Sequence, residues 1–162
     1  MTNFNVVDNF LDKEYFDILQ EAIMGHNFPW LYEAAVANPG EDNEDHFYFT
    51  HRVYEHGKPS SSFYDELSPL LYELQPKAIA RIRVMLYVNQ GKLIVHDNHK
   101  DFDWSHKTTL IYFNTCNGYT GFGENKVQSV ANRAVHFDGS HEHHSTTCTD
   151  QKVRTVMSLN YF

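Results

Sequence analysis

Three side chains in the second half of the chain have the types and the spacing of a metal site. His99 and Asp101 are two residues apart, so on a strand both side chains would point to the same face. A second imidazole, His143, lies far along the chain. Two histidines and one carboxylate can hold one face of an octahedral iron(II) ion and leave the opposite positions open. We therefore take these three residues as candidate metal ligands and as the candidate catalytic centre.

Several neighbouring histidines compete for the same role. His141 shares strand parity with His143 and is its main rival for the second imidazole position. His96 and Asp97 are adjacent, so on a strand they would point to opposite faces and make a poor pair of ligands. His144 is expected to point away from His143 for the same reason. A His-x-Asp triplet alone occurs in many surface turns, so the prediction depends on the combination.

An arginine completes the combination. Arg154 opens an apolar strand that includes residues 156–159. A guanidinium buried beside a metal site is well shaped to hold a carboxylate through two parallel hydrogen bonds. The pattern thus predicts a carboxylate-binding position next to the metal.

Composition limits the classes of function. With 162 residues the chain is expected to form one domain, 1–162, with a sizeable core. The net charge of −8 disfavours nucleic acid as a partner, since phosphate contacts need clustered basic residues. An aromatic content of 15% suits strands and pockets for small ligands. Eleven histidines make a metal site worth testing.

Cysteine usage and the first residues bear on location. Cys116 and Cys148 do not form a Cys-x-x-Cys pair, so neither a zinc knuckle nor a dithiol redox site is expected. Residues 1–5 lack the basic and apolar regions of a signal peptide, and no apolar run approaches membrane length. We expect a cytoplasmic protein (in the host cytoplasm if the chain is viral) with no membrane partner, a reducing setting that suits ferrous iron.

The first half of the chain is expected to supply helical support, mainly over residues 10–75. Asp12 is a plausible N-cap for a helix that ends near Gly25. A second helical pattern covers 63–74, in which Pro69 must start a new turn or kink the helix. Short strands are expected over 4–10, 30–37 and 46–50.

A break at residues 38–40 is followed by the acidic residues Glu41, Asp42, Glu44 and Asp45. Such a run is usually a solvated loop. The functional alternative is a mobile flap that recruits a basic or polar substrate.

The second half, mainly residues 79–162, reads as short strands without intervening helices. This spacing predicts a sandwich or jelly roll, so the fold class is mainly β with flanking helices. The expected strands cover 80–88, 107–114, 119–122, 126–130, 134–137 and 153–161.

Taken together, these motifs resemble the small iron(II)- and 2-oxoglutarate-dependent oxygenases of the prolyl 4-hydroxylase-like type, in particular the compact single-domain members of viruses and bacteria. The resemblance covers the second half strongly and the first half by layout only. The matching segments are His99-x-Asp101, 109–114, 117–122, 132–139, His143 and Arg154.

The resemblance implies a double-stranded β-helix, a jelly-roll or cupin-like fold. In this fold the strand of the His-x-Asp motif lies beside that of the second histidine, which would bring His99, Asp101 and His143 to one iron ion. Arg154 matches the family residue that binds the distal carboxylate of 2-oxoglutarate.

Other cosubstrate contacts are implied in the same way. Tyr112 matches a family tyrosine that hydrogen-bonds this carboxylate, and Tyr87 matches one that lies beside the cosubstrate, although plain core packing is the alternative for both. Many relatives carry Arg-x-Ser on the last strand, whereas this chain has Val156 at the third position. Ser158 or Thr120 would then supply the missing hydroxyl, or Tyr112 would suffice without it.

The implied activity uses iron(II), 2-oxoglutarate and O2, with ascorbate as an optional reductant. It hydroxylates a C–H bond and releases succinate and CO2. A prolyl residue in a peptide or protein is the first choice of substrate, and a free amino acid or other small molecule is the alternative.

A non-oxygenase, cupin-like metal protein is the alternative from another class, and it would not need Arg154 or Tyr112. A nucleic-acid demethylase is disfavoured by the acidic charge, and the oligomeric state is left open.

Overall fold

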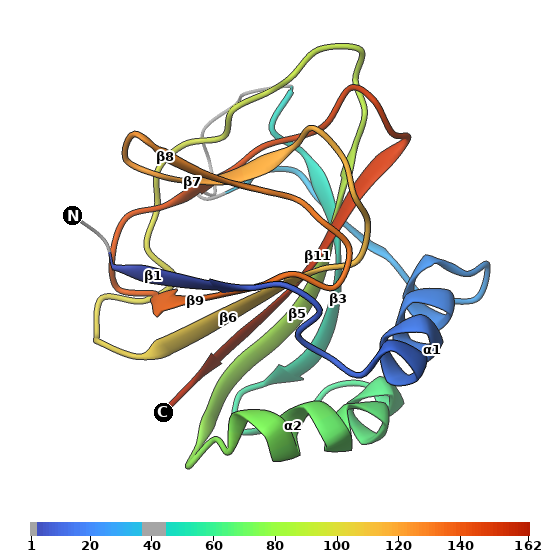
Figure 1. Cartoon of the computed structure of the whole chain (residues 1–162), viewed down its shortest axis with the longest axis vertical. Helices are drawn as coiled ribbons and strands as arrows, with labels where there is room; N and C mark the ends of the chain where they lie inside the picture. Colours follow the sequence, from blue (N-terminus) through green and yellow to red (C-terminus); the bar gives the residue numbers. More distant parts are fainter. Residues whose placement is uncertain (1–2, 37–44) are drawn as a thin grey trace.

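The computed structural model describes residues 3–36 and 45–162, which form two antiparallel sheets with helices outside the larger one (Figure 1). The larger sheet has the order β1-β9-β6-β11-β5-β3-β2, with β4 paired to β3, and the smaller has the order β10-β7-β8. The predicted jelly-roll class is therefore confirmed. The elements are β1 (Phe4–Val7), α1 (Lys13–Met24), β2 (Leu31–Glu33), β3 (Tyr48–Glu55), β4 (Lys58–Pro59), the 3-10 helix η1 (Ser62–Leu67), α2 (Ser68–Leu74), β5 (Ile79–Val88), β6 (Lys107–Tyr112), β7 (Tyr119–Phe122), β8 (Asn125–Gln128), β9 (Ala134–Asp138), β10 (His144–Ser145) and β11 (Val153–Tyr161).

The helices begin where the sequence predicts. The side chain of Asp12 accepts hydrogen bonds from the backbone N–H groups of Glu14 and Tyr15, which caps α1. The second helical segment is divided at Ser68 into a 3-10 turn and α2, with Pro69 in the first turn of α2. Proline is tolerated there because its missing N–H has no partner within the helix.

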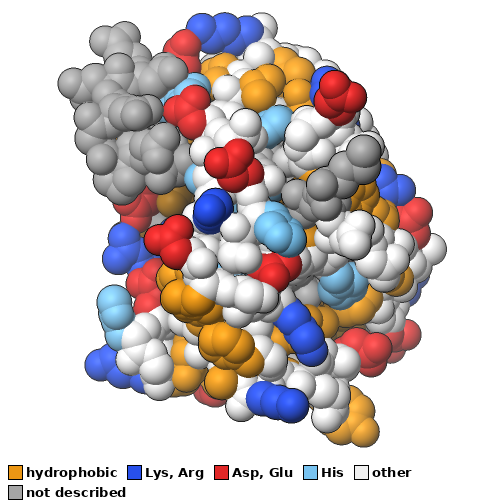
Figure 2. Space-filling view, turned by 90° about the vertical axis from the view of Figure 1, so that its left-hand side faces the viewer, with side chains coloured by type: hydrophobic (Ala, Val, Ile, Leu, Met, Phe, Trp, Pro, Cys, Tyr) orange, Lys and Arg blue, Asp and Glu red, His pale blue; other side chains and the backbone are white. Residues whose placement is uncertain are grey.

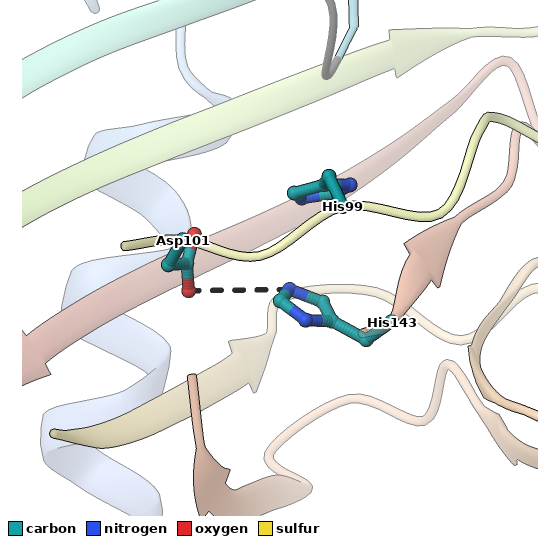
Figure 3. Close-up of side chains that lie close together, drawn as sticks. All are labelled: His99, Asp101 and His143. Carbon is teal, nitrogen blue, oxygen red and sulfur yellow. Dashed lines mark ion pairs between the residues drawn. The ribbon is translucent and has the colours of Figure 1, made fainter. Parts of the chain in front are cut away.

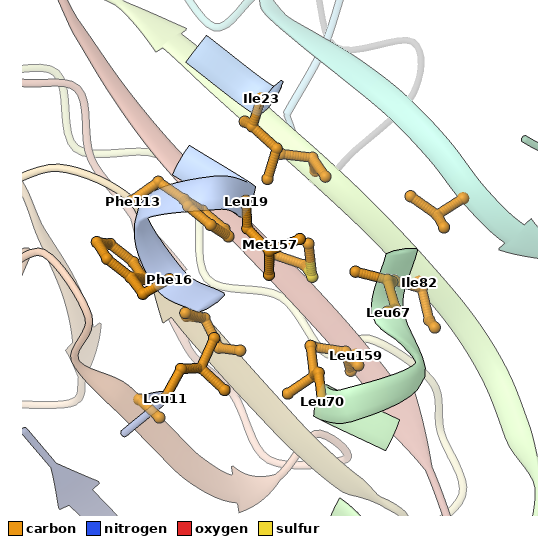
Figure 4. Close-up of a cluster of buried hydrophobic side chains, with 14 of the residues drawn as sticks. Leu11, Phe16, Leu19, Ile23, Leu67, Leu70, Ile82, Phe113, Met157 and Leu159 are labelled. Atoms are coloured by element: carbon orange, nitrogen blue, oxygen red, sulfur yellow. The ribbon is translucent and has the colours of Figure 1, made fainter. Parts of the chain in front are cut away.

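The helices cover the outer face of the larger sheet and form the main core with it (Figure 4). Ile82 on β5 and Met157 on β11 point to this side and are fully buried. They meet Leu19 of α1 and the fully buried Leu67 and Leu70. Each such side chain contributes on the order of 1.5–3 kcal/mol when it leaves water, so this face anchors the two strands that carry the site.

The inner faces of β5 and β11 hold the polar side chains. Strand alternation places residues 81, 83, 85 and 87 of β5 opposite the core face. The register aligns Arg154 with Tyr87, Val156 with Met85, Ser158 with Arg83 and Asn160 with Arg81. On its other edge, β11 aligns Val156 with Tyr112 and Ser158 with Leu110 of β6. Two neighbouring strands thus turn their polar residues toward one interior.

Some boundaries differ from the prediction. The first strand stops at Val7 rather than residue 10, and Asn9 takes a left-handed conformation with φ 51°. The third strand runs on to Glu55, well past residue 50. The expected break at 38–40 and the acidic residues 41, 42 and 44 lie outside the described residues.

The surface carries no broad apolar face on the side shown in Figure 2, where hydrophobic side chains are interspersed with charged ones. Histidine and acidic side chains adjoin near the middle of this view. Within the described residues, no helix has the length and apolar character needed to cross a membrane.

Candidate metal centre

The structure brings His99, Asp101 and His143 together although His143 lies far from the other two in the chain (Figure 3). One possible ligand atom from each residue lies within 4.8 Å of the others. His99 and His143 form an isolated antiparallel bridge, in which each backbone N–H donates to the other residue's carbonyl, at 2.9 and 3.0 Å. The backbone N–H of Asp101 donates to the carbonyl of Gly139 at 2.9 Å. Backbone pairing therefore sets the triad, although the motif forms a bridge and not the full strand that we expected.

The imidazoles are oriented by the backbone. Nδ1 of His99 lies 3.3 Å from the carbonyl oxygen of Asp97, and Nδ1 of His143 lies 3.0 Å from that of His141. A carbonyl can only accept, so Nδ1 carries the proton and Nε2 keeps its lone pair for a metal. Burial, and next His143, lower the pKa of His99 to about 4. Its neutral, metal-binding form therefore dominates at neutral pH.

Asp101 is held by two neighbouring strands. Its Oδ1 accepts a hydrogen bond from Arg81 Nη2 at 2.7 Å, and its Oδ2 accepts one from Asn160 Nδ2 at 2.8 Å. Oδ2 also lies 3.9 Å from His143 Nε2. Burial acts to raise the pKa of Asp101, but His143, Arg81, the Asn160 hydrogen bond and His99 together lower it by more, so the pKa lies below its usual value. The group is therefore ready to act as an anionic ligand.

The rival histidines have other positions. His141 is exposed and contributes its carbonyl to His143. His96 is buried, with Nδ1 2.8 Å from Ser145 Oγ. His144 has Nδ1 2.9 Å from the side-chain oxygen of Asn98. Of the three, none belongs to the group formed by the triad within the described residues.

A second group, which the sequence spacing did not indicate, consists of Cys116, Cys148 and Asp150. Both thiols are buried and free. Burial, and then Cys116, raise the pKa of Cys148 to about 12. Because metals bind the thiolate, the raised pKa of Cys148 makes this group a poor metal site.

A narrow cavity of about 50 Å³ runs from the triad toward Arg154. Arg154 is fully buried, and its Nη1 donates to the carbonyl of Thr146 at 3.1 Å. Its guanidinium carbon lies 5.6 Å from the ring centre of Tyr87 and 5.3 Å from that of Tyr112. The cavity lining is Arg83, Met85, Tyr87, His99, Asp101, Leu110, Thr120, His143, His144, Ser145, Arg154, Val156 and Ser158.

The lining of this cavity includes hydrogen-bond donors that lack acceptors. The hydroxyl of Thr120 accepts from Tyr112 at 2.8 Å and from Nη2 of Arg154 at 3.0 Å, which uses both of its lone pairs and leaves its own hydrogen to donate. Nε of Arg154 and Oγ of Ser158 are buried without a hydrogen-bond partner. Buried polar groups are nearly always satisfied, so these donors fit a carboxylate ligand.

The predicted cosubstrate residues are thus placed as follows. Thr120, Ser158 and Tyr87 line the cavity, whereas Tyr112 is absent from its lining but contacts Arg154 with its ring and shares Thr120 with it. Val156 itself carries no hydroxyl, and the hydroxyl-bearing Thr120 and Ser158 line the same cavity.

Sequence reasoning missed several supporting residues. Gly118, which we noted only as a turn signal, has no positive φ. A Cβ there would lie 2.6 Å from Cδ of Arg154 and 2.5 Å from the carbonyl oxygen of Thr147. The glycine therefore makes room for the buried arginine. Arg81 and Asn160, which hold Asp101, were also missed, because their role depends on the register of β5 and β11.

Comparisons with known proteins agree with this geometry. No protein-family model matches the sequence, and no curated protein is similar to it in sequence. Among solved structures, a 2OG-Fe(II) oxygenase family oxidoreductase from Burkholderia pseudomallei has a TM-score of 0.69 at 11% identity, covering 98% of this chain and 84% of the other. A prolyl hydroxylase from Trichoplax adhaerens, solved with a hypoxia inducible factor peptide, has a TM-score of 0.68 at 14% identity, covering 100% and 84%.

A third similar structure is SnoN, a non-heme alpha-ketoglutarate-dependent epimerase from nogalamycin biosynthesis. Its TM-score is 0.64 at 13% identity, and the match covers 99% of this chain and 78% of that one. The Trichoplax protein was solved with a peptide and SnoN belongs to nogalamycin biosynthesis, and all identities are low, so these likenesses bear on the fold. The chain has the fold of the 2-oxoglutarate- and iron(II)-dependent oxygenases.

Proposed function

We propose that this protein is an iron(II)- and 2-oxoglutarate-dependent dioxygenase that hydroxylates a C–H bond. The observation that carries the proposal is the cavity that joins the metal triad to Arg154. One end offers two imidazole Nε2 atoms and a carboxylate, and the other offers unpaired donors in a buried setting. A dicarboxylate with one end at the metal satisfies both ends of this cavity.

The residues have distinct roles in this proposal. His99, Asp101 and His143 hold the metal ion, and Arg154 binds the distal carboxylate together with Thr120 and Ser158 on the same cavity wall. When iron(II), 2-oxoglutarate and O2 are bound, they supply an oxidant strong enough for a C–H bond and yield succinate and CO2.

The apolar part of the cavity has a separate role. Leu110, Val156 and Met85 line the passage between the metal and the arginine. They exclude water, which strengthens the ion pair with the carboxylate.

For the prime substrate, a prolyl residue in a peptide or protein is the first candidate, and a free amino acid or other small molecule is the second. The Trichoplax enzyme was solved with a peptide, and SnoN is an epimerase in a biosynthetic route. Because both kinds of protein share this fold, the fold is compatible with either a peptide residue or a small molecule as the prime substrate.

The test is an anaerobic titration of the protein with iron(II) and 2-oxoglutarate, in which chelation of the ferrous ion gives a weak visible charge-transfer band. We expect the band in the wild type and in His141→Ala, and its loss in His143→Ala. The two variants remove the same side chain from positions two residues apart, so His141→Ala is a matched control. A wild type without the band would contradict the proposal.

The competing class is a cupin-like metal protein without oxygenase activity. It would keep the triad but would not need a buried guanidinium. Under our proposal, Arg154→Gln raises the Kd for 2-oxoglutarate by about ten- to a hundredfold, the loss typical of a charge-assisted hydrogen-bonded pair. Iron(II) binding, measured separately, stays unchanged. Turnover assays with ascorbate, to keep the iron ferrous, then follow succinate formation.

A further inference from the structure

A second, wider cavity opens on the other side of the metal triad. Its volume is about 300 Å³, which suits a molecule the size of an amino acid. It shares five residues with the narrow cavity, so a molecule bound there lies beside the metal ligands. The shared residues are Arg83, Met85, Tyr87, His99 and Asp101.

Four of the six charged side chains in this wider cavity form ion pairs with one another, and Lys100, which has no ion pair among the described residues, is exposed. Arg52 donates to Glu33 at 2.6 Å and lies 3.8 Å from Glu55. Arg81 is bound to Asp101. Arg83 differs from both: among residues 3–36 and 45–162 it has no carboxylate within ion-pair distance and no side-chain hydrogen bond, and its Nε is buried without a partner.

The register shows why Arg83 lacks an internal partner. Its direct neighbour on β3 is Arg52, and its neighbour on β11 is Ser158. Arg81, two residues away on the same face of β5, adds a further like charge. Like charges side by side on a sheet destabilise it unless an anion lies between them. Nε of the half-buried Arg83 is itself buried without a hydrogen-bond partner, which is costly, so the site favours an anionic ligand.

The positive charge of this cavity also contrasts with the negative charge of the whole chain. Its lining contains Arg52, Arg81, Arg83 and Lys100 but only Glu33 and Asp101 as acids. The whole chain carries a net charge of −8. Because the chain as a whole is acidic, the excess of basic residues is a local property of the cavity lining.

We propose that Arg83 binds a carboxylate of the prime substrate, so that the substrate class is a molecule with a free carboxylate close to the C–H bond that reacts. This inference rests on the proposed function and narrows its substrate. It favours a free amino acid or a C-terminal residue over a residue inside a peptide, whose carbonyl is uncharged. The guanidinium fork suits a carboxylate held through two hydrogen bonds.

Because Arg83 lines both cavities, the carboxylate could instead belong to 2-oxoglutarate, at the end near the metal. The experiment separates these sources. Calorimetry measures the binding of N-acetyl-proline, N-acetyl-leucine and N-acetyl-lysine, each beside its primary amide, to protein loaded with iron(II) and 2-oxoglutarate without oxygen. The variants are Arg83→Gln, Arg83→Lys and a control for net charge, Lys152→Gln, at an exposed position.

We expect at least one acid to bind about tenfold more tightly than its amide in the wild type and in Lys152→Gln. In Arg83→Gln this preference disappears while the Kd for 2-oxoglutarate, read from the charge-transfer band, is unchanged. Arg83→Lys keeps part of the preference. Equal binding of acids and amides, binding of neither, or an equal loss of 2-oxoglutarate affinity in Arg83→Gln would overturn the inference. A missing band in the wild type would instead count against the proposed function.

Discussion

His99 and His143 hold each other by two backbone hydrogen bonds, so the two imidazoles are brought together by the main chain and not by the metal. Their ring centres lie 4.6 Å apart, and each ring is fixed through Nδ1 by a carbonyl two residues earlier in the chain. A site built in this way exists before the ion binds. Its ligand side chains lose little conformational entropy when the ion binds, which favours tight metal binding.

A pre-formed site predicts that metal stabilises a chain that is already folded. We expect the metal-free protein to unfold cooperatively and Mn²⁺, a redox-stable substitute, to raise its Tm. At a hundred times the Kd, the linkage amounts to about 2.7 kcal/mol. Thermal unfolding followed by circular dichroism measures the shift. His143→Ala should lose the shift and His141→Ala should keep it, whereas an unfolded metal-free protein would contradict this prediction.

Gly118 gives a test of the carboxylate end that leaves Arg154 itself in place. In Gly118→Ala the new methyl group meets Cδ of Arg154 and the carbonyl oxygen of Thr147, so the guanidinium must move. We expect weaker 2-oxoglutarate binding, by about tenfold or more, with unchanged Mn²⁺ stabilisation. The charge-transfer titration and the thermal shift measure the two effects.

The control for this variant is Gly91→Ala. Gly91 has φ +79° and open space around its Cβ position, so alanine strains the backbone without touching the site. It should lower stability by about 1 kcal/mol and leave 2-oxoglutarate binding intact. If both variants bind 2-oxoglutarate as the wild type does, Gly118 is not needed for the position of Arg154.

The sequence predicted most elements and the His-x-Asp spacing because these depend on local patterns, whereas the approach of the distant His143 was expected from the family resemblance. Asp12 as a cap, the strand at 153–161 and the His-x-Asp spacing are all properties of a few adjacent residues. The choice of His143 over His141 also followed from combining its position with that of Arg154. Such signals persist in the structure because local geometry decides them.

The supporting residues were not predictable in the same way. Asn160 and Arg81 reach Asp101 only because β11 and β5 pair in one register, and a shift of one residue would turn both to the core side. The alternation of Arg81 and Arg83 with Ile82 and Val84 was nevertheless visible, and it indicated two arginines on the inner face. Attention to which side chains alternate along this strand, and not only to motifs, would have indicated the basic residues that line the wider cavity.

His96 gives a prediction for pH dependence. It is 2% exposed, and burial, then His46 and Arg154, lower its pKa from the ordinary histidine value of 6.5 to about 3. The unfolded chain therefore binds a proton below pH 6.5 that the folded chain does not bind until about pH 3. The contribution of His96 to the free energy of unfolding is therefore complete above pH 6.5. It falls as the pH drops from 6.5 toward 3, by at most about 1.4 kcal/mol per pH unit.

Replacing His96 should remove its contribution to the slope of the free energy of unfolding against pH. In urea unfolding between pH 7 and pH 5, we expect the wild type to lose up to about 2 kcal/mol more stability than His96→Gln. His96→Phe fills the same space with a different shape, so the two variants will differ in absolute stability. They should nevertheless share the shallower pH dependence, because the slope comes from the titrating group and not from packing. If either variant keeps the wild-type slope, another group is responsible for acid sensitivity in this range.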